Sequence, residues 1–356
     1  MKIVTVVGAR PQFIKAAVVS RILRKQKGAQ EILLHTGQHF DDNMSKIFFE
    51  ELEIPSPDYN LGIHSLLNGA MTGRMIEGIE EILLKEKPDW VLVYGDTNST
   101  LAGAVAARKL HLKLAHVEAG MRSFNMQMQE EINRILTDRI SNLLFCSTTN
   151  AVKNLKDEGF KNFDCRVVKS GDVMYDAALY YSDKSTSESK ILESISSPEF
   201  VLCTLHRGEN TDDPKTLNRI FSALAKIHKE VPVVLPIHPR TRNTLNQWGI
   251  KVPFHVIDPV GYLEMLTLVK HCKLVITDSG GLQKEAFFFK KFCITIREET
   301  EWTELVDLKA NRTVGSDEKK ILKAFKVFSK KKMKIKTSPY GKGNASEKIV
   351  RELLAT

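Results

Sequence analysis

The sequence predicts an α/β fold of two Rossmann-like domains, each with a doubly wound parallel sheet, and three observations support this. Short apolar runs alternate with stretches of helical period along the chain, and repeated strand–helix units build parallel sheets with helices on both faces. At 356 residues the chain is too long for one core and suits two domains of ordinary size. The polar, Ser-rich stretch 181–200 (YSDKSTSESKILESISSPEF) is typical of a helix followed by a linker.

The expected strands lie on apolar runs of the kind that parallel sheets bury on both faces. They are 3–7, 31–36, 90–94, 114–117, 142–146, 200–204, 231–237, 255–257, 274–277 and 292–296. The clearest helical periods between them are 71–86, 101–110, 151–158 and 213–230. Ten strands exceed one small sheet, so we expect a first domain at 1–170 and a second at 171–356.

The composition is that of a soluble globular protein, with 42% hydrophobic and 27% charged residues. The net charge of +9 comes from one segment, 319–342, which holds ten lysines and no acidic residue. Because this segment lacks arginine and has few aromatic residues, we interpret it as a solvated face and expect no nucleic-acid partner.

The five cysteines are scattered and show no C-x-x-C spacing, which indicates reduced thiols in place of disulfides or a zinc site. No apolar run approaches the roughly 20 residues that a membrane span needs. The chain starts on an expected strand, without the charged and apolar regions of a signal peptide. We therefore expect a cytoplasmic protein with no membrane association.

Polar residues stand beside turn residues at the ends of several expected strands. They occur in GAR (8–10), GDT (95–97), HVEAG (116–120), HR (206–207), HPR (238–240) and DSGG (278–281). A single residue of this kind is more often a helix cap. In doubly wound folds, however, ligands bind beyond the carboxyl ends of the strands. The whole set therefore predicts a ligand site, which we expect in the cleft between the two domains.

The stretch DSGGLQKEA (278–286) indicates a nucleotide. Ser279, Gly280 and Gly281 precede an expected helix, and bare N–H groups at a helix N-terminus favour a phosphate. Glu285 lies further into that helix, where its carboxylate could accept hydrogen bonds from a ribose diol. The spacing is not that of a Walker A loop, and no G-x-G-x-x-G is present to hold NAD.

The first half of the chain contributes carboxylates at Asp96, Glu118 and Glu131. Arg134 follows Glu131 by three positions, so the two share a helix face. A carboxylate crowded by others near a cleft has a raised pKa and can act as an acid or a base. No metal-ligand spacing such as H-E-x-x-H is present, so we expect no metal.

Seven motifs follow one another as GARPQFIK, TGQHFD, GDTNST, HVEAGMRSFN, EEINR, HRGEN and DSGGLQKEA. Together they resemble the UDP-N-acetylglucosamine 2-epimerase family, the non-hydrolysing bacterial kind, and the match runs from residue 3 to about residue 308. The resemblance implies a GT-B-like fold, a last helix (about 343–356) packed back on the first domain, and a homodimer.

The resemblance also implies a reaction. Family members interconvert UDP-GlcNAc and UDP-ManNAc without a cofactor and supply precursors for surface polysaccharides. UDP leaves C1 as the C2 proton is removed, which gives 2-acetamidoglucal, and UDP adds back as C2 is reprotonated on the other face. Matching motif residues assign catalysis to Asp96, Glu118, Glu131 and His206, and UDP-sugar binding to Arg10, Lys15, Arg134, His238, Ser279, Gly280, Gly281 and Glu285.

Two cations in GARPQFIK fit this chemistry. The departing diphosphate gathers negative charge, and fixed cations where that charge develops lower the barrier. Arg10 and Lys15 would supply them, while Pro11 suits the first helical position because its missing N–H costs little there. Solvated helix-start residues are a poor alternative, since cations oppose the positive end of the helix dipole.

The chain departs from the family pattern at several motifs. ARPQFIK replaces a common TRPEAIK, and TGQHFD replaces a common AQHRE, where Gln38 and His39 would belong to a regulatory UDP-GlcNAc site. GARPQFIK, MRSFN and ETEWTELVD are closer to relatives that epimerise modified sugars, such as UDP-2,3-diacetamido-glucuronate or UDP-6-deoxy-N-acetylhexosamines. A GT-B glycosyltransferase, a hydrolysing 2-epimerase and a non-enzymatic nucleotide-binding module are the other functions that the sequence leaves open.

Overall fold

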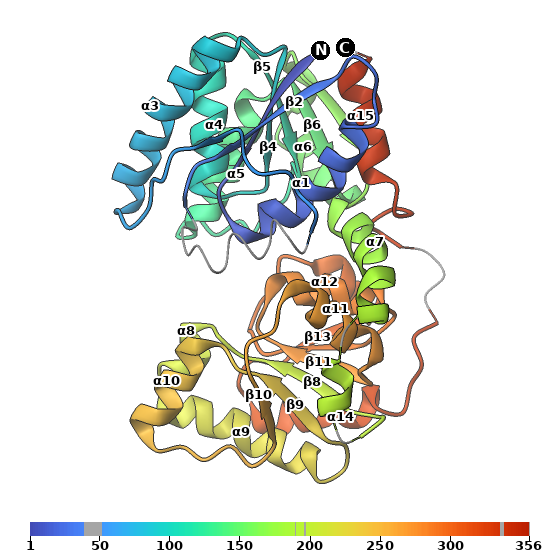
Figure 1. Ribbon diagram of the computed structural model, residues 1–356. Helices are drawn as coiled ribbons and strands as arrows, with labels where there is room; N and C mark the ends of the chain where they lie inside the picture. The colour runs from blue at the N-terminus through green and yellow to red at the C-terminus, as the bar shows by residue number, and fades with distance from the viewer. Residues whose placement is uncertain (39–51, 189, 196, 335–337, 356) are drawn as a thin grey trace. The chain divides into compact units, whose positions relative to one another are not determined.

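The computed structural model describes residues 1–38, 52–188, 190–195, 197–334 and 338–355. The chain divides into two compact units (Figure 1). Unit 1 comprises Met1–Leu179 and Ser338–Thr356, and unit 2 comprises Tyr180–Thr337. The division falls inside helix α7 (Val173–Glu188). Unit 1 therefore extends past the expected boundary at residue 170 and also takes in the C-terminal segment.

Unit 1 is built on a parallel sheet of seven strands in the order β3-β2-β1-β4-β5-β6-β7. The strands are β1 (Lys2–Val7), β2 (Gln30–His35), β3 (Tyr59–Asn60), β4 (Trp90–Tyr94), β5 (Lys113–Val117), β6 (Leu143–Cys146) and β7 (Arg166–Lys169). The chain order reverses between β1 and β4, which is the switch point where such folds bind ligands.

Most helices of unit 1 lie between these strands in the chain, and one comes from the end of the sequence. They are α1 (Arg10–Leu23), α3 (Asn68–Glu86), α4 (Asn98–Lys109), α5 (Gln129–Ile140), α6 (Thr149–Asp157), the short η1 (Phe160–Asn162) and the late helix α15 (Ala345–Leu354). Apolar residues of β1 and α3, such as Val4, Val6, Met75 and Ile79, are fully buried together. This burial of apolar area is the main force that holds the sheet and its helices together.

Helix α15 packs against α1 (Figure 1). Its first turn is held by Asp176, which accepts hydrogen bonds from the N–H groups of Ala345 and Ser346 at 3.1 and 2.8 Å. Ser346 Oγ also donates to Asp176, at 2.5 Å. Burial raises the pKa of Asp176, and the hydrogen bonds from Ser346 offset only part of that rise. The last helix is thus an integral part of unit 1.

Unit 2 has a parallel sheet of six strands in the order β10-β9-β8-β11-β12-β13. The strands are β8 (Val201–Thr204), β9 (Val233–Pro236), β10 (His255–Ile257), β11 (Leu274–Thr277), β12 (Cys293–Thr295) and β13 (Asn311–Thr313). The helical segments are η2 (Ile191–Ser194), α8 (Gly208–Thr211), α9 (Pro214–His228), α10 (Pro239–Trp248), α11 (Tyr262–His271), α12 (Gly280–Phe288), α13 (Thr303–Asp307) and α14 (Glu318–Phe328).

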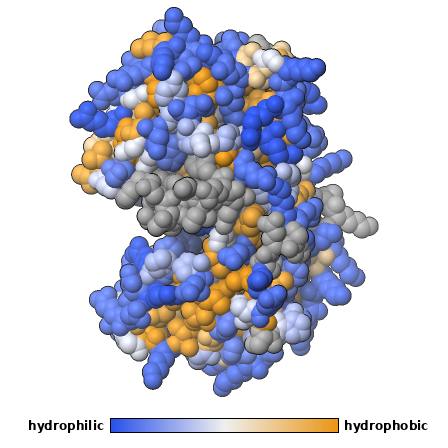
Figure 2. All heavy atoms as spheres, viewed as in Figure 1, coloured by the Kyte–Doolittle hydropathy of each residue, from blue (hydrophilic) through white to orange (hydrophobic). Residues whose placement is uncertain are grey.

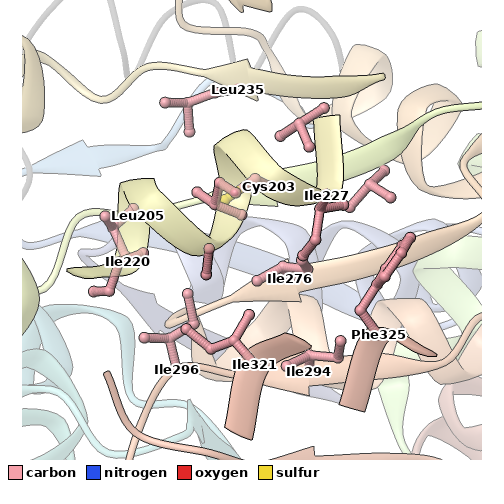
Figure 3. Close-up of a cluster of buried hydrophobic side chains, with 14 of the residues drawn as sticks. Cys203, Leu205, Ile220, Ile227, Leu235, Ile276, Ile294, Ile296, Ile321 and Phe325 are labelled. Carbon is pink, nitrogen blue, oxygen red and sulfur yellow. The ribbon is translucent and has the colours of Figure 1, made fainter. Parts of the chain in front are cut away.

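One core of unit 2 lies between one face of its sheet and helices α9 and α14 (Figure 3), and a second lies on the other face. Ile220 and Ile227 from α9 and Ile321 from α14 are fully buried against strand residues such as Cys203 and Ile276. All five cysteines are free, as expected for reduced thiols. Burial raises the pKa of the Cys272 and Cys293 thiols to about 12 each, so these thiols are structural.

The ten expected strands are all present, with ends shifted by a residue or two. Among the described residues, three further strands were not expected: β3, β7 and β13, each at the edge of a sheet. Within the same ranges, no group of three metal-ligating side chains gathers, and no helix has the length and apolar character needed to cross a bilayer. The visible surface is mainly hydrophilic, and hydrophobic residues gather in one area on unit 2 (Figure 2).

Candidate active site

The first turn of α1 is fixed to the end of β4 by one buried side chain, Gln12. The N–H groups of Gly8 and Ala9 donate to Gln12 Oε1 at 2.8 and 3.0 Å. Gln12 Nε2 donates to Tyr94 O and Thr100 Oγ1, both at 2.9 Å. Gly8 is required here, because a β-carbon would come within 2.1 Å of two hydroxyl oxygens. These contacts fix the residues that follow Gly8 at the carboxyl end of the sheet.

Arg10 and Lys15 start from this turn. Arg10 is half-buried at the first position of α1. Lys15 is buried, and its Nζ lies 2.8 Å from Glu118 Oε2, just beyond β5. Lys15 Nζ also lies 3.1 Å from where a β-carbon on Gly95 would be. The structure thus pairs Lys15, expected at the phosphates, with a carboxylate.

Glu118 has a backbone φ of +74°, in the left-handed region. This conformation costs a residue other than glycine on the order of 1 kcal/mol or more, and such strain persists where surrounding contacts enforce it. It sets the side chain of Glu118 against Lys15, where 12% of that side chain stays exposed.

Arg134 on α5 joins the other two carboxylates. Its Nη2 donates to Asp96 Oδ2 at 2.5 Å and its Nη1 to Glu131 Oε2 at 2.8 Å. Burial opposes the charge of Arg134, but the charges of Asp96, Glu131 and Glu118 outweigh burial and raise its pKa. The predicted cluster Asp96–Glu118–Glu131–Arg134 therefore lies together with Lys15.

The carboxylates differ in access. Glu131 is fully buried, and it also accepts the N–H groups of Ser123 and Phe124 at 2.9 and 2.8 Å. The Asp96 side chain is 32% exposed, and its backbone carbonyl accepts from Asn133 Nδ2 at 2.9 Å. Asp96 is thus open to a ligand, whereas the oxygens of Glu131 are occupied by protein donors.

A second ionic network, which the sequence did not predict, shares helix α5 with this cluster. Asp138 on α5 contacts His116 Nδ1 at 2.7 Å and accepts from Arg122 Nη1 at 2.7 Å. Arg122 also donates to both oxygens of Glu158, at 2.6 and 2.8 Å. Of these residues, only His116 was noted at a strand end. The signal for Asp138 is its spacing from Glu131 and Arg134, which places all three on one helix face.

Gln38 connects the end of β2 with the start of α4. Its Oε1 accepts from the N–H and the hydroxyl of Ser99, at 3.2 and 2.7 Å. His39, expected beside it in a regulatory site, lies outside the described residues. That regulatory site stays a prediction.

In unit 2, His206 is held by Asp278. His206 Nδ1 lies 3.1 Å from Asp278 Oδ1, and 38% of the His206 side chain is exposed. Asp278 is fully buried and also accepts from the N–H groups of His206 and Arg207 at 3.0 and 2.9 Å. Burial opposes ionisation of Asp278, but His206 and these N–H groups together lower its pKa. Asp278 is therefore an anion that orients the imidazole.

His238 stands beside His206, with the two ring centroids 5.7 Å apart. It is the N-cap of α10, and its Nδ1 accepts from the N–H of Arg240 at 3.2 Å. The exposed edge of this pair lies at the carboxyl ends of β8 and β9. Unit 2 thus brings together the two histidines that the sequence singled out.

The start of α12 carries the predicted phosphate residues. Ser279 is the N-cap, Gly280 begins the helix, and Gly281 is exposed with open space where a β-carbon would be. A β-carbon on Gly280 would come within 2.6 Å of Glu301 Oε1. Glu285 is buried further along the helix. An N-terminus lined by glycines suits a diphosphate.

Comparisons with known proteins give one family. The family model described as UDP-N-acetylglucosamine 2-epimerase matches residues 21–354. The chain is 55% identical over 354 residues, 99% of both chains, to the UDP-2,3-diacetamido-2,3-dideoxy-D-glucuronate 2-epimerase of Pseudomonas aeruginosa. It is 50% identical, over 99% of both chains, to a UDP-N-acetylglucosamine 2-epimerase homolog of Methanococcus maripaludis.

A solved structure is similar over the whole chain. The UDP-GlcNAc 2-epimerase of Methanocaldococcus jannaschii, in complex with UDP-GlcNAc and UDP, has a TM-score of 0.89, 41% identity and 100% coverage of both chains. This similarity confirms the expected fold class, two Rossmann-like parallel-sheet domains of the GT-B-like type. The expected cleft stays a prediction.

Proposed function

Because the chain belongs to the UDP-N-acetylglucosamine 2-epimerase family, we propose that it inverts C2 of a UDP-linked 2-acetamido sugar. The parent pair is UDP-GlcNAc and UDP-ManNAc. The observation that carries the proposal is the ionic cluster of unit 1, where Arg134 holds Asp96 and Lys15 holds Glu118. An isomerase of this kind requires carboxylates at a sugar carbon and no hydride carrier.

The proposed reaction is an elimination followed by an addition. A carboxylate removes the C2 proton, the C2–H electron pair forms the C1=C2 double bond, and the C1–O pair leaves with UDP. UDP then adds back to C1 of the 2-acetamidoglucal while C2 receives a proton on the opposite face. Asp96 and Glu118 are the proposed proton-transferring groups, since part of each side chain is exposed. The buried Glu131 holds Arg134 in place.

The leaving group requires positive charge and proton donors. We assign the UDP moiety to unit 2, where α12 starts at Ser279, Gly280 and Gly281, with Glu285 as the proposed ribose contact. His206 has an exposed ring and a buried carboxylate partner, which suits a group that protonates or binds a phosphate oxygen. Arg10 at the start of α1 adds a cation, and His238 supports His206.

A modified sugar is a second candidate substrate. The relative that is 55% identical is named for UDP-2,3-diacetamido-2,3-dideoxy-D-glucuronate, and that name favours a substituent at C3 and a carboxylate at C6. Elimination across C1 and C2 is the same for both substrates. We further propose a cytoplasmic homodimer that supplies surface polysaccharide precursors.

Proton NMR in D2O tests the reaction on a panel of UDP-GlcNAc, UDP-2,3-diacetamido-glucuronate and a UDP-6-deoxy-N-acetylhexosamine. We expect one substrate to gain deuterium at C2 and to yield its C2 epimer as a UDP-sugar. Release of a free sugar would indicate a hydrolysing epimerase instead. Binding of UDP without exchange on any member would contradict the proposal and favour a transferase or a binding module.

A further inference from the structure

We propose that Asp138 is a positioning residue for the proposed epimerisation, because a buried network centred on its carboxylate sets the backbone that carries Asp96 and Glu118 and the loop that holds the side chain of Glu131. The inference rests on the proposed function. Asp138 and His116 are both fully buried, so neither can touch a substrate. Their effect has to pass through the groups that they hold.

The first arm of the network reaches the ends of β4 and β5. His116 Nδ1 lies 2.7 Å from Asp138 Oδ1, and His116 Nε2 lies 2.7 Å from the carbonyl oxygen of Gly95. A carbonyl can only accept, so Nε2–H donates to it, and one proton lies between Nδ1 and Oδ1. Gly95 directly precedes Asp96, and His116 precedes Glu118 by two residues. One imidazole thus fixes the backbone on which both carboxylates stand.

The second arm holds the loop after β5. Asp138 Oδ2 accepts from the N–H of Gly120 at 3.0 Å and from Arg122 Nη1 at 2.7 Å. Gly120 has a φ of +77°, and a β-carbon there would come within 2.4 Å of Ala151 O. Arg122 is fixed further by its two bonds to Glu158. This arm therefore ties the loop to α5 at Gly120 and Arg122.

The same loop then supports Glu131. The N–H groups of Ser123 and Phe124, directly after Arg122, donate to the two oxygens of Glu131. Glu131, Arg134 and Asp138 are spaced three and four residues apart on α5, and all three are buried. One helix face therefore binds Asp96 through Arg134, the loop through Glu131, and the strand ends through Asp138. Replacing Asp138 would release two arms at once.

The test uses Asp138→Asn, which keeps the shape but removes the negative charge that faces Arg122 and the proton shared with His116 Nδ1. The matched control is Asp176→Asn, another buried aspartate of unit 1 that accepts backbone N–H groups and a hydroxyl. We expect Asp138→Asn to lower kcat for C2 exchange about 100-fold, as small misplacements of reacting groups do. KM for the UDP-sugar should change less than about threefold, since the binding groups stay in place. Asp176→Asn should lower the melting temperature but keep kcat.

Two results would overturn the inference. One is a kcat of Asp138→Asn within about threefold of the wild type, and the other is an equal loss of kcat in both variants at equal melting temperature. If Asp138→Asn does not fold, Glu158→Gln decides, because the Glu158 side chain is 34% exposed. It should lower kcat severalfold with KM unchanged, and an unchanged kcat would refute the network. Failure of the wild type to exchange on every UDP-sugar would instead refute the proposed function.

Discussion

Each unit contains a histidine paired with a fully buried aspartate, and the two pairs differ in one respect. In unit 1, His116 and Asp138 are 2.7 Å apart, and both side chains have no exposure. In unit 2, His206 and Asp278 are 3.1 Å apart, and 38% of the His206 side chain is exposed. Both aspartates also accept backbone N–H groups, from Gly120 and from Arg207. The pairs therefore differ in what the rest of the imidazole contacts. In unit 1, His116 Nε2 lies 2.7 Å from the carbonyl oxygen of Gly95, whereas in unit 2 part of the His206 side chain is exposed.

Exposure of the imidazole, and not the presence of a paired aspartate, decides whether such a histidine can react with a ligand or only holds the backbone. An aspartate that orients a histidine is the arrangement of many catalytic sites. Where the far nitrogen is exposed, the ring can exchange a proton with a ligand. Where that nitrogen donates a hydrogen bond to a buried carbonyl, the same pair can only hold the backbone. The carboxylates of unit 1 follow the same rule, with Asp96 open and Glu131 sealed.

The largest expected effect is at the open carboxylate. Asp96→Asn should lower C2 exchange by about 1,000-fold or more, because an amide cannot take the C2 proton. Its melting temperature should stay within about 2 °C of the wild type, because the side chain is partly exposed. Deuterium incorporation and a thermal melt measure both quantities. Exchange within about tenfold of the wild type would mean that the open carboxylate is not the base.

We expect the second largest loss of activity at the exposed histidine, His206. His206→Ala is expected to lower turnover about 100-fold by removing a proton donor. His255→Ala is the matched control, since His255 is an exposed histidine of the same unit, on β10. A steady-state assay of both variants measures the effect. Equal turnover of His206→Ala and His255→Ala would contradict the assignment of His206 as a reacting histidine.

The smallest expected effect is on acid stability. The pKa of Asp278 is lowered in the folded state, so its ionised form contributes stability above the unfolded pKa of about 3.8. That contribution is lost as the pH falls through the lowered folded value. Asp278→Asn should therefore be less stable than the wild type near neutral pH, and the gap should close below about pH 3.8.

Urea unfolding of both proteins between about pH 3 and pH 7 measures this gap. The burial-raised pKa of Asp176 has the opposite sign, so ionisation of Asp176 costs stability as the pH rises through its folded value. The gap between Asp176→Asn and the wild type should not close in acid in the same way. A gap for Asp278→Asn that widens toward low pH would contradict the sign.

The sequence predicted the central strands and the edge strand β10, but it missed the other three edge strands, β3, β7 and β13. Central strands are apolar along their whole length, as in WVLVY of β4. The missed strands β3 (YN), β7 (RVVK) and β13 (NRT) carry polar residues and are only partly buried. An edge strand pairs on one side only, so it needs no continuous apolar run. Its position is set by the neighbour that it pairs with.

The candidate site divides in a similar way. Residues at strand ends could be predicted because parallel strands deliver them to one edge of the sheet. Asp138 lies on α5, Glu158 follows the end of α6 and Arg122 lies in a loop, so only packing brings them together. Helix α5 also has an inverted pattern, with Glu131, Arg134 and Asp138 buried while Ile132 and Leu136 are 39% and 47% exposed. A search for apolar periodicity would therefore predict that the face with Ile132 and Leu136 is the buried one, although the charged face is buried.

The position of α15 in the chain has a consequence for synthesis on the ribosome. Asp176 receives its partners Ala345 and Ser346 only after the whole of unit 2 has been translated. Unit 2 is contiguous and can finish folding while unit 1, begun earlier, still lacks the helix that covers α1. During that interval the nascent chain therefore exposes the apolar face of unit 1 that α15 later covers. We expect chaperones that bind exposed hydrophobic segments to act on this face.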